Sequence, residues 1–385
     1  MIAAIPKETL AGERRVAIVP AHVPLLKKLG LDVALETGAG AEAGFPDREY
    51  EAQGAHVLPS RAEVEGRADL LLEVRTPGAN QHTGPAEASA LRRGIIVIGL
   101  ADPLGTPEAA EALATAGVTS FALELVPRIT RAQSMDVLSS MATVAGYKAV
   151  LIGAAALPRL CPMMMTAAGT IAPAKVFVVG AGVAGLQAIA SARKLGAKVD
   201  AYDVRPAVKE QINSLGAKFV ELPLETGTSE DSGGYAKAQD ESFYRRQREM
   251  MLKVVAGADM VITTAAVPGK KSPVLITEEM VKGMAPGSVI VDLAAERGGN
   301  CELTKADETI VAHGVTILGP TNLPATVPYH ASQMYSRNVV TFVQHLIKDG
   351  QVVFDMEDEI TRDTLVTRNG EVVNARVRAA LQQPA

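Results

Sequence analysis

The sequence predicts an α/β protein with two doubly wound parallel-sheet domains joined by two long helices. Three observations lead to this prediction. Short apolar runs of Val, Ile, Leu and Ala alternate with helix-like stretches, which is the pattern of a parallel sheet covered on both faces. The alternation stops at a long, nearly uncharged segment, 137–158, and begins again at "KVFVVGAGVAG". A second long helical pattern, "PYHASQMYSRNVVTFVQHLIKDG", follows the second series of strands.

The first domain is predicted to comprise residues 1–136 and 329–385, because the second long helix carries the chain back to it. Its expected strands are "MIAAIP", "DVALET", "ADLLLEV", "GIIVIGL" and "VTSFALEL". Between them, "PAHVPLLKKLG" and "PEAAEALATAG" are typical of helices that end at a glycine. Near the C-terminus, Asn369-Gly370 between β-rich flanks predicts a two-residue hairpin.

The second domain is predicted to comprise residues 137–328, beginning with the long apolar helix. Its expected strands are "KVFVV", "KVDAYDV", "AKFVEL", "ADMVITTA", "SVIVDLA" and "VTILG". Segment 225–248 interrupts this series and is rich in Gly, Ser and charge. It is either a tolerated surface insertion or a lid beside a ligand crevice, and the sequence leaves both interpretations open.

Composition excludes several classes of protein. A net charge of −5 over 385 residues gives no electrostatic footprint for nucleic acid. The two cysteines, Cys161 and Cys301, have no partner at metal-ligand spacing, so we expect no metal and a reducing, cytoplasmic compartment. The N-terminus is not a signal peptide. Segment 137–158 approaches the length of a membrane span, but its Ser, Thr and Gly content predicts a buried interdomain or subunit-contact helix and no membrane insertion.

A dinucleotide-binding fingerprint opens the second domain. Gly180, Gly182 and Gly185 have the GxGxxG spacing, directly after an apolar strand and at the start of an Ala-rich helix. In this context the first glycine permits a tight turn, the second lets the backbone approach a pyrophosphate, and the third lets helix and strand pack closely. Ala181 and Val183 lie within the turn, where free N–H groups face the phosphates. The alternative is a glycine turn without a ligand.

Asp203 ends the next strand, 18 residues after Gly185, and is placed to accept hydrogen bonds from an adenosine ribose. Its charge disfavours the 2′-phosphate of NADP, whereas Arg205 would favour that phosphate. The sequence therefore predicts NAD over NADP. Ala265 and Ala266 follow a later strand of the same sheet, so we expect them to flank the cofactor, although plain packing would also explain two small residues there.

The polar stretch "RITRAQSMDVLS" lies between the two predicted domains, where we expect the mouth of their cleft. Gln133 and Asp136 have the groups to hydrogen-bond a carboxamide and ribose hydroxyls, and Arg128 the charge to anchor Asp136 or a phosphate. The alternative is a solvated linker.

With these motifs the chain resembles the NAD(H)-binding soluble subunit, or domain I, of proton-translocating NAD(P) transhydrogenase. The resemblance covers nearly the whole chain and rests on "PKE…ERRVAIVP", "RITRAQSMDVLSS", "GAGVAGLQAIA" with "YDVR", "SGGYAK" and "VDLAAERGGN". It implies that Arg128, Gln133, Asp136 and Ser139 take part at the nicotinamide end and that a mobile loop with Tyr235 at its tip closes over the nucleotide. It extends the expected cofactor contacts to Ile129, Ser134, Met135, Val204 and Gly234.

The resemblance also implies an activity and an assembly. Hydride would pass directly between NADH on this chain and NADP⁺ on a partner subunit, with either stereochemical class (Si-specific or Re/Si-specific) open. A membrane-spanning subunit would translocate the proton. The chain ends at "RVRAALQQPA" without a span, as in the version with a separate soluble subunit on the cytoplasmic face of the inner membrane. The small-residue face of 137–158 and the pairing of proteins with this fold predict a homodimer.

Two other functions remain open at this stage. Alanine dehydrogenase shares the fold and binds pyruvate through an Arg, a Lys, a His and an Asp. Here Arg15 matches, but Arg75 stands for the Lys, "VIGLADP" contains no His, and Glu296 stands for the Asp. Without a His to act as acid or base, an amino-acid dehydrogenase is disfavoured. The third possibility is a non-catalytic NAD-binding protein.

Overall fold

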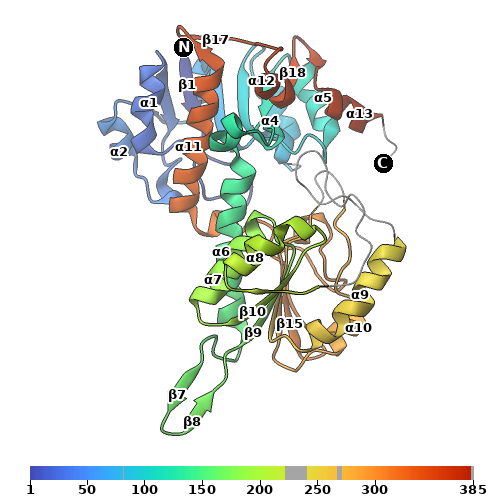
Figure 1. Cartoon of the computed structure of the whole chain (residues 1–385). Coiled ribbons are helices and arrows are strands. Elements are labelled where there is room, and N and C mark those ends of the chain that lie inside the picture. The colour runs from blue at the N-terminus through green and yellow to red at the C-terminus, as the bar shows by residue number, and fades with distance from the viewer. Residues whose placement is uncertain (81, 222–240, 267–270, 383–385) are drawn as a thin grey trace. The chain divides into compact units, whose positions relative to one another are not determined.

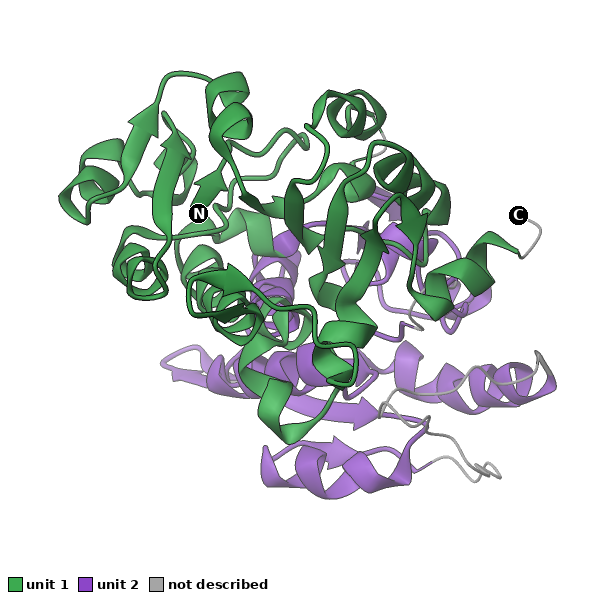
Figure 2. Ribbon diagram, turned by 90° about the horizontal axis from the view of Figure 1, so that it is seen from above, with its two compact units in different colours: residues 1–141, 324–385 green, residues 142–323 purple. Residues whose placement is uncertain are grey.

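The computed structural model describes residues 1–80, 82–221, 241–266 and 271–382. It divides into two compact units (Figures 1 and 2). Unit 1 consists of Met1–Met141 and Pro324–Ala385, and unit 2 of Ala142–Leu323. Each unit contains a mostly parallel sheet with helices packed on it, which confirms the predicted fold class. The first turn of the long apolar helix belongs to unit 1, whereas the sequence placed this whole helix in the second domain.

Unit 1 contains an eight-stranded sheet in the order β19-β18-β6-β5-β4-β1-β2-β3. Six strands run in parallel, whereas β18 pairs antiparallel with β6 and β19 antiparallel with β18. Asn369 and Gly370 turn between the last two strands with φ of 54° and 85°, which confirms the predicted hairpin. The strands are β1 Ile2–Ile5, β2 Asp32–Glu36, β3 His56–Leu58, β4 Leu70–Arg75, β5 Ile96–Leu100, β6 Thr119–Ala122, β18 Leu365–Arg368 and β19 Glu371–Val372.

A long helix, α11 (Pro328–Leu346), returns the chain to unit 1. The hydroxyl of its buried Tyr335 donates to the Glu73 carbonyl at 2.8 Å, and Ser332 and Ser336 each accept a backbone N–H from the 16–19 segment at 3.0 Å.

The remaining helices of unit 1 are α1 Val23–Lys28, α2 Asp47–Ala52, α3 Arg61–Arg67, α4 Gly84–Ala90, α5 Pro107–Thr115, α12 Glu359–Thr364 and α13 Ala375–Leu381, with 3-10 turns η1 Pro20–His22, η2 Ala41–Ala43, η3 Pro77–Ala79, η4 Leu123–Leu125 and η5 Thr130–Met135. Ile347–Lys348 (β16) and Gln351–Val352 (β17) form a small hairpin after α11.

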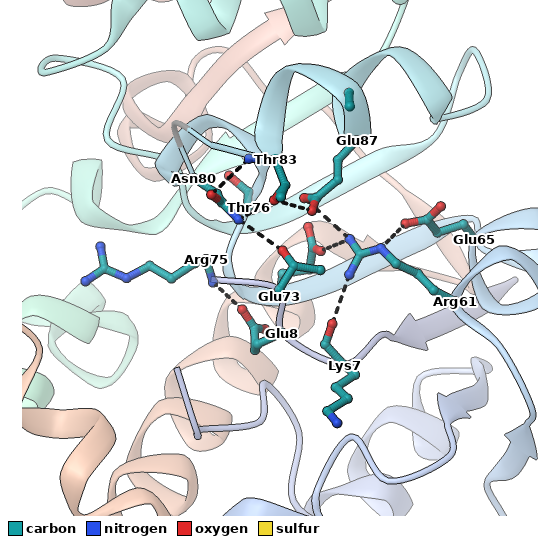
Figure 3. Close-up of polar contacts among 12 residues, drawn as sticks. Lys7, Glu8, Arg61, Glu65, Glu73, Arg75, Thr76, Asn80, Thr83 and Glu87 are labelled. Carbon is teal, nitrogen blue, oxygen red and sulfur yellow. Dashed lines mark hydrogen bonds and ion pairs between the residues drawn. The ribbon is translucent and has the colours of Figure 1, made fainter. Parts of the chain in front are cut away.

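A cluster of charged side chains lies at the carboxyl end of β4 (Figure 3). The Glu8 carboxylate accepts the backbone N–H groups of Val74 and Arg75 at 2.7 and 3.0 Å. Glu73 accepts a hydrogen bond from Arg61 at 2.7 Å through one oxygen, while its other oxygen is buried without a partner in the described structure. Burial raises the pKa of Glu8 from 4.5 to about 8, helped by the nearby charge of Glu73. Burial likewise raises the pKa of Glu73 to about 7, against the opposing pull of Arg61.

Unit 2 contains a seven-stranded sheet in the order β11-β10-β9-β12-β13-β15-β14. All neighbours are parallel except β14, which pairs antiparallel with β15 and was not predicted. The chain reverses its direction of strand addition between β9 and β12, and in such sheets ligands bind at the carboxyl ends of the strands beside that point. The strands are β9 Lys175–Val179, β10 Lys198–Tyr202, β11 Lys218–Phe219, β12 Met260–Thr263, β13 Val289–Asp292, β14 Thr309–Ala312 and β15 Val315–Leu318.

Two helices of unit 2 contact neighbouring backbone atoms closely at a glycine. A Cβ atom at Gly185 in α7 (Val183–Lys194) would lie 1.9 Å from the Gly180 carbonyl oxygen, and one at Gly146 in α6 (Val137–Ala156) would lie 2.1 Å from the Ala184 carbonyl oxygen. The other helices are α8 Lys209–Ser214, α9 Glu241–Ala256 and α10 Glu278–Lys282, with 3-10 turns η6 Pro206–Val208, η7 Ala295–Arg297 and η8 Leu323–Thr326 at the unit boundary.

Helix α6 ends two residues earlier than predicted and is followed by a hairpin that the sequence did not predict. Strands β7 (Met164–Thr166) and β8 (Gly169–Ile171) form this hairpin (Figure 1). All six strand residues are exposed. Among the described residues, α6 alone has the length and apolar composition of a membrane span, and 39% of that stretch is buried inside the protein. The contact of Gly146 with α7 accounts for part of this burial.

Glu8→Gln is expected to gain stability relative to the wild-type protein as the pH rises from about 5 to about 8. Between pH 4.5 and about 8 the folded protein keeps a proton on Glu8 that the unfolded chain has released. Wild-type stability therefore falls as the pH rises through this window, and glutamine, which does not titrate, removes that part of the loss. Calorimetric melting temperatures of both proteins at several pH values measure the effect.

The matched control is Glu51→Gln, which changes an exposed carboxylate on α2. It controls for the loss of one carboxylate from the surface of unit 1. A difference in melting temperature between Glu8→Gln and the wild type that does not change with pH would contradict the raised pKa of Glu8.

Gly185→Ala is expected to destabilise unit 2 by about 1–3 kcal/mol, because the added methyl group forces α7 away from β9. Gly182→Ala is the control, since a Cβ atom there meets nothing within 4 Å. Urea unfolding of the two variants compares them directly. Equal midpoints for both variants would show that the close approach of helix and strand contributes nothing to stability.

Candidate nucleotide-binding site

The glycine-rich turn lies between β9 and α7, as its spacing predicts. Gly180 has a φ of 97°, a conformation that L side chains rarely adopt, and a Cβ atom there would lie 2.5 Å from the Thr264 hydroxyl. Gly182 is the N-cap of α7 and has open space where its side chain would be. Ala181 is buried, and Val183 begins the helix. Within the described part of the chain, the turn therefore leaves space beside the N-terminus of a 12-residue helix, which is the geometry that receives a pyrophosphate.

Asp203, directly after β10, is nearly buried and lies against this turn. One carboxylate oxygen accepts the Ala181 N–H at 2.7 Å and the other the Arg205 N–H at 2.9 Å. The Arg205 guanidinium adds two further bonds of 2.9 Å, one to each oxygen. Four hydrogen bonds fill the usual acceptor capacity of a carboxylate. A ribose hydroxyl can therefore bind Asp203 only by replacing a guanidinium N–H, a constraint that the sequence did not reveal. Val204, between these two residues, is half-buried.

The carboxyl end of β12 completes the same edge of the sheet. The Thr264 hydroxyl donates to the Gly180 carbonyl at 3.0 Å and ties the end of β12 to the glycine turn. Ala265 is half-buried and Ala266 exposed. The structure thus brings the glycine turn, Asp203 and the two alanines together from three adjacent strands.

In unit 1, the predicted nicotinamide loop forms the 3-10 turn η5 and the start of α6. Arg128, Gln133 and Ser134 are exposed, Ile129 is half-buried and Met135 is buried. Asp136 does not extend into solvent: its carboxylate accepts the Ser139 N–H at 2.9 Å and the Ser139 hydroxyl at 2.6 Å. These two predicted site residues therefore also begin helix α6, because an Asp at this position satisfies free N–H groups of the first turn. The Gln133 side chain makes no hydrogen bond within the described residues.

Asn338 on α11 holds this loop and was missed by the sequence reasoning. Its side-chain N–H donates to the Ser134 carbonyl at 2.8 Å, and its side-chain oxygen is buried without a partner among the described residues. The available signal was a polar amide within an apolar helical stretch, "SRNVVTFV". Gly234 and Tyr235 of the predicted lid lie outside the described residues.

Among the residues that correspond to an oxo-acid site, Arg15 is held in a buried ion pair. Both Nε and Nη2 of Arg15 donate to Glu13, at 2.7 and 2.6 Å, and both side chains are almost completely buried. Arg75 points away from Glu8 in Figure 3, and Glu296 is exposed in unit 2. In addition, the described residues contain no group of three or more His, Cys, Asp or Glu side chains able to hold a metal ion.

Comparisons with known proteins cover both units. Residues 4–145 match the family model "Alanine dehydrogenase/PNT, N-terminal domain", and residues 149–375 match "Alanine dehydrogenase/PNT, C-terminal domain". An NAD(P) transhydrogenase subunit alpha protein of Rhodospirillum rubrum is 47% identical over 374 residues, which cover 96% of this chain and 97% of that protein. The crystal structure of transhydrogenase from Sinorhizobium meliloti is 45% identical with a TM-score of 0.84, covering 97% of this chain and 99% of that chain.

Alanine dehydrogenase is more distant. The enzyme of Bacillus subtilis is 30% identical over 380 residues, which cover 97% of this chain and 92% of that protein. The chain therefore belongs to the alanine dehydrogenase/PNT family, in which its sequence groups with the alpha subunits of NAD(P) transhydrogenase.

Proposed function

We propose that this chain is the NAD(H)-binding subunit of a proton-translocating transhydrogenase. It binds NADH and passes a hydride directly to NADP⁺ held on a partner subunit, while a membrane-spanning subunit translocates the proton. The observation that carries this proposal is the glycine turn at 180–185, with its open helix N-terminus and Asp203 beside it.

A single dinucleotide turn accounts for the need of a partner. The turn between β9 and α7 has room for one pyrophosphate, so the second nicotinamide must arrive on another chain. Hydride transfer between two nicotinamide rings moves no substrate proton, and the protein has only to orient the rings and exclude water. The proposed site accordingly relies on backbone N–H groups and side-chain amides, and not on a side chain that acts as an acid or a base, as a dehydrogenase does.

The state of Arg15 argues against oxidation of a small amino acid on this chain. An oxo-acid carboxylate would need a guanidinium free to form two parallel hydrogen bonds. Glu13 already takes two N–H groups of Arg15 in a nearly water-free environment. A substrate that displaced Glu13 from Arg15 would leave the buried Glu13 carboxylate without its partner, which is strongly unfavourable.

Within this function, we assign the loop at 128–139 to the nicotinamide end. Gln133 has the exposed amide that a carboxamide would bind, and Arg128 the exposed charge. Asp136 and Ser139 fix the start of α6 and thereby the direction of the loop. The lid residues Gly234 and Tyr235 would close over the bound nucleotide. The complex would lie on the cytoplasmic face of the inner membrane.

The decisive experiment mixes the purified chain with a candidate NADP-binding subunit and follows reduction of an NAD analogue by NADPH. Transfer that requires both chains supports the proposal. NADH oxidation by pyruvate or another small oxo acid, without a partner, would instead identify a dehydrogenase. Nucleotide binding with no turnover in either assay would identify a binding protein.

NADH is expected to bind at least ~10-fold more tightly than NADPH, the scale of one ~1.4 kcal/mol hydrogen bond to a charged group. The reason is that Asp203 accepts a hydrogen bond from the adenosine 2′-hydroxyl of NADH, whereas its charge repels the 2′-phosphate of NADPH. Asp203→Ala releases the Arg205 guanidinium and should reduce the preference for NADH over NADPH. Gly182→Ala should weaken the binding of both nucleotides by the same factor. Calorimetric titration of the wild type and both variants with each nucleotide measures these affinities. Equal affinities in the wild-type protein would refute the assignment of Asp203.

Gln133→Asn is expected to lower the rate of hydride transfer by up to ~100-fold, because the shortened amide misplaces the nicotinamide ring. NADH affinity should stay within a few-fold of wild type, since the adenosine half is held in unit 2. Stopped-flow measurement with saturating partner gives the rate. Arg131→Lys is the control, because this neighbour is paired with Asp358 and not assigned to the site. Wild-type transfer by Gln133→Asn would show that the loop is only a connector.

The chain is expected to form a homodimer. Helix α6 exposes Tyr147, and the β7–β8 hairpin exposes Met164, Met165 and Ile171, which are apolar side chains that a second copy would cover. Light scattering at micromolar concentration should give twice the chain mass of 40.3 kDa. A mass of one chain would rule the dimer out.

A further inference from the structure

A buried asparagine joins the two ends of the segment that flanks the nucleotide edge of unit 2. Asn300 is 0% exposed. Its side-chain oxygen accepts the Ala265 N–H at 2.9 Å, and its side-chain N–H groups donate to the carbonyls of Ala265 at 2.8 Å and Pro273 at 2.9 Å. One amide therefore holds both ends of 265–273.

The backbone of Asn300 is itself held by a buried carboxylate. One oxygen of Asp292, at the end of β13, accepts the N–H groups of Asn300 and Cys301 at 2.7 and 2.9 Å and the Thr304 hydroxyl at 2.6 Å. Its other oxygen accepts the Thr263 hydroxyl at 2.9 Å. The chain reaches this position through Gly298 and Gly299, which have φ of 92° and 82°. A Cβ atom at Gly299 would lie 2.7 Å from the Asp292 carboxylate.

The same arrangement connects Asn300 to the glycine turn. Ala265 directly follows Thr264, whose hydroxyl is bonded to the Gly180 carbonyl. Beyond the segment, the Asn300 carbonyl accepts the N–H groups of Leu275 and Ile276 at 2.8 and 2.9 Å. Asn300 thus lies at the centre of a continuous network that runs from β13 to the edge where the dinucleotide is proposed to bind.

We propose that Asn300 is a positioning residue for hydride transfer, which it serves by keeping Ala265 and Ala266 in place beside the bound dinucleotide. This inference rests on the proposed function. The chemistry requires an amide, because one side chain must accept from an N–H and donate to two carbonyls. A carboxylate cannot donate, an aliphatic side chain can do neither, and a serine is too short to reach both ends.

The test compares Asn300→Ala and Asn300→Ser with Asn374→Ala. Asn374 is also a buried asparagine whose amide holds backbone groups, but it caps α13 in unit 1, far from this segment in sequence. All three variants lose buried hydrogen bonds, so melting temperatures identify a temperature at which each is folded. At that temperature, single-turnover hydride transfer to partner-bound NADP⁺ is measured at saturating NADH, together with hydrogen exchange of the Ala265 amide.

The Asn300 variants are expected to transfer hydride ~10- to 100-fold more slowly than wild type, the scale of a small misplacement at the reacting centre. The Ala265 amide should exchange at least tenfold faster, and Asn374→Ala should match the wild type in both measurements. Asn300 variants that are folded and transfer hydride within twofold of wild type would overturn the proposal, whatever their exchange rates. If Asn300→Ala does not fold, Asn300→Ser decides the outcome.

Failure of the proposed function gives a different result. In that case the wild-type chain itself transfers no hydride to the partner, and the Asn300 variants have no rate to lose. A wild-type protein that is active while the Asn300 variants are slow supports both statements. An active wild-type protein with equally active Asn300 variants removes only the role of Asn300.

Discussion

The nucleotide edge of unit 2 depends on backbone atoms that lie closer together than any side chain would allow. Helix α7 touches β9 at Gly185, and α6 touches α7 at Gly146, in both cases with a carbonyl oxygen about where a Cβ atom would be. The distances are 1.9 and 2.1 Å, far inside any real contact. Because of these two contacts, the N-terminus of α7 lies directly above the end of β9. The positive end of this helix then faces the place where the phosphates of the dinucleotide are proposed to bind.

In both units, carboxylates that are wholly or partly buried serve the backbone of the protein itself. Asp203 holds the glycine turn, Asp292 holds the turn after β13, and Asp136 begins α6. Each is satisfied by hydrogen bonds within its own unit, which fixes loops that lack regular structure. Among the residues assigned to the nicotinamide end, those with exposed polar groups are Arg128, Gln133 and Ser134, none of which is a carboxylate or a histidine. Such a site suits a reaction in which rings are oriented and no proton is exchanged with a substrate.

The sequence predicted most of the fold because its signals are local. The apolar runs at β1, β4, β5, β9, β12 and β13 lie where expected, and Asn369-Gly370 turns as its residue types require. The β7–β8 hairpin was missed because "CPMMMTAAGTIAP" is apolar yet exposed, which contradicts the usual relation between pattern and burial. Strand β14 was missed because it is a short, partly exposed edge strand, "TIVA". In the candidate site, the glycine spacing located the turn. The Asp203–Arg205 pairing was not predictable, because a residue pattern does not show which of several acceptors a side chain binds. The Asn300 contacts were not predictable either, because they join positions 35 residues apart in the sequence.

The sheet of unit 1 draws its last strands from the end of the chain, and this order has a consequence during synthesis. Residues 142–323 fold into unit 2 from one continuous stretch, so all of its strands have been made before α11 is complete. Unit 1 has by then only β1 to β6, and β6 remains an open edge until β18 pairs with it. An unpaired strand edge is a template for association with other chains. The edge of β6 therefore stays unpaired until the last part of the chain has been made, whereas all strands of unit 2 are available earlier on the ribosome.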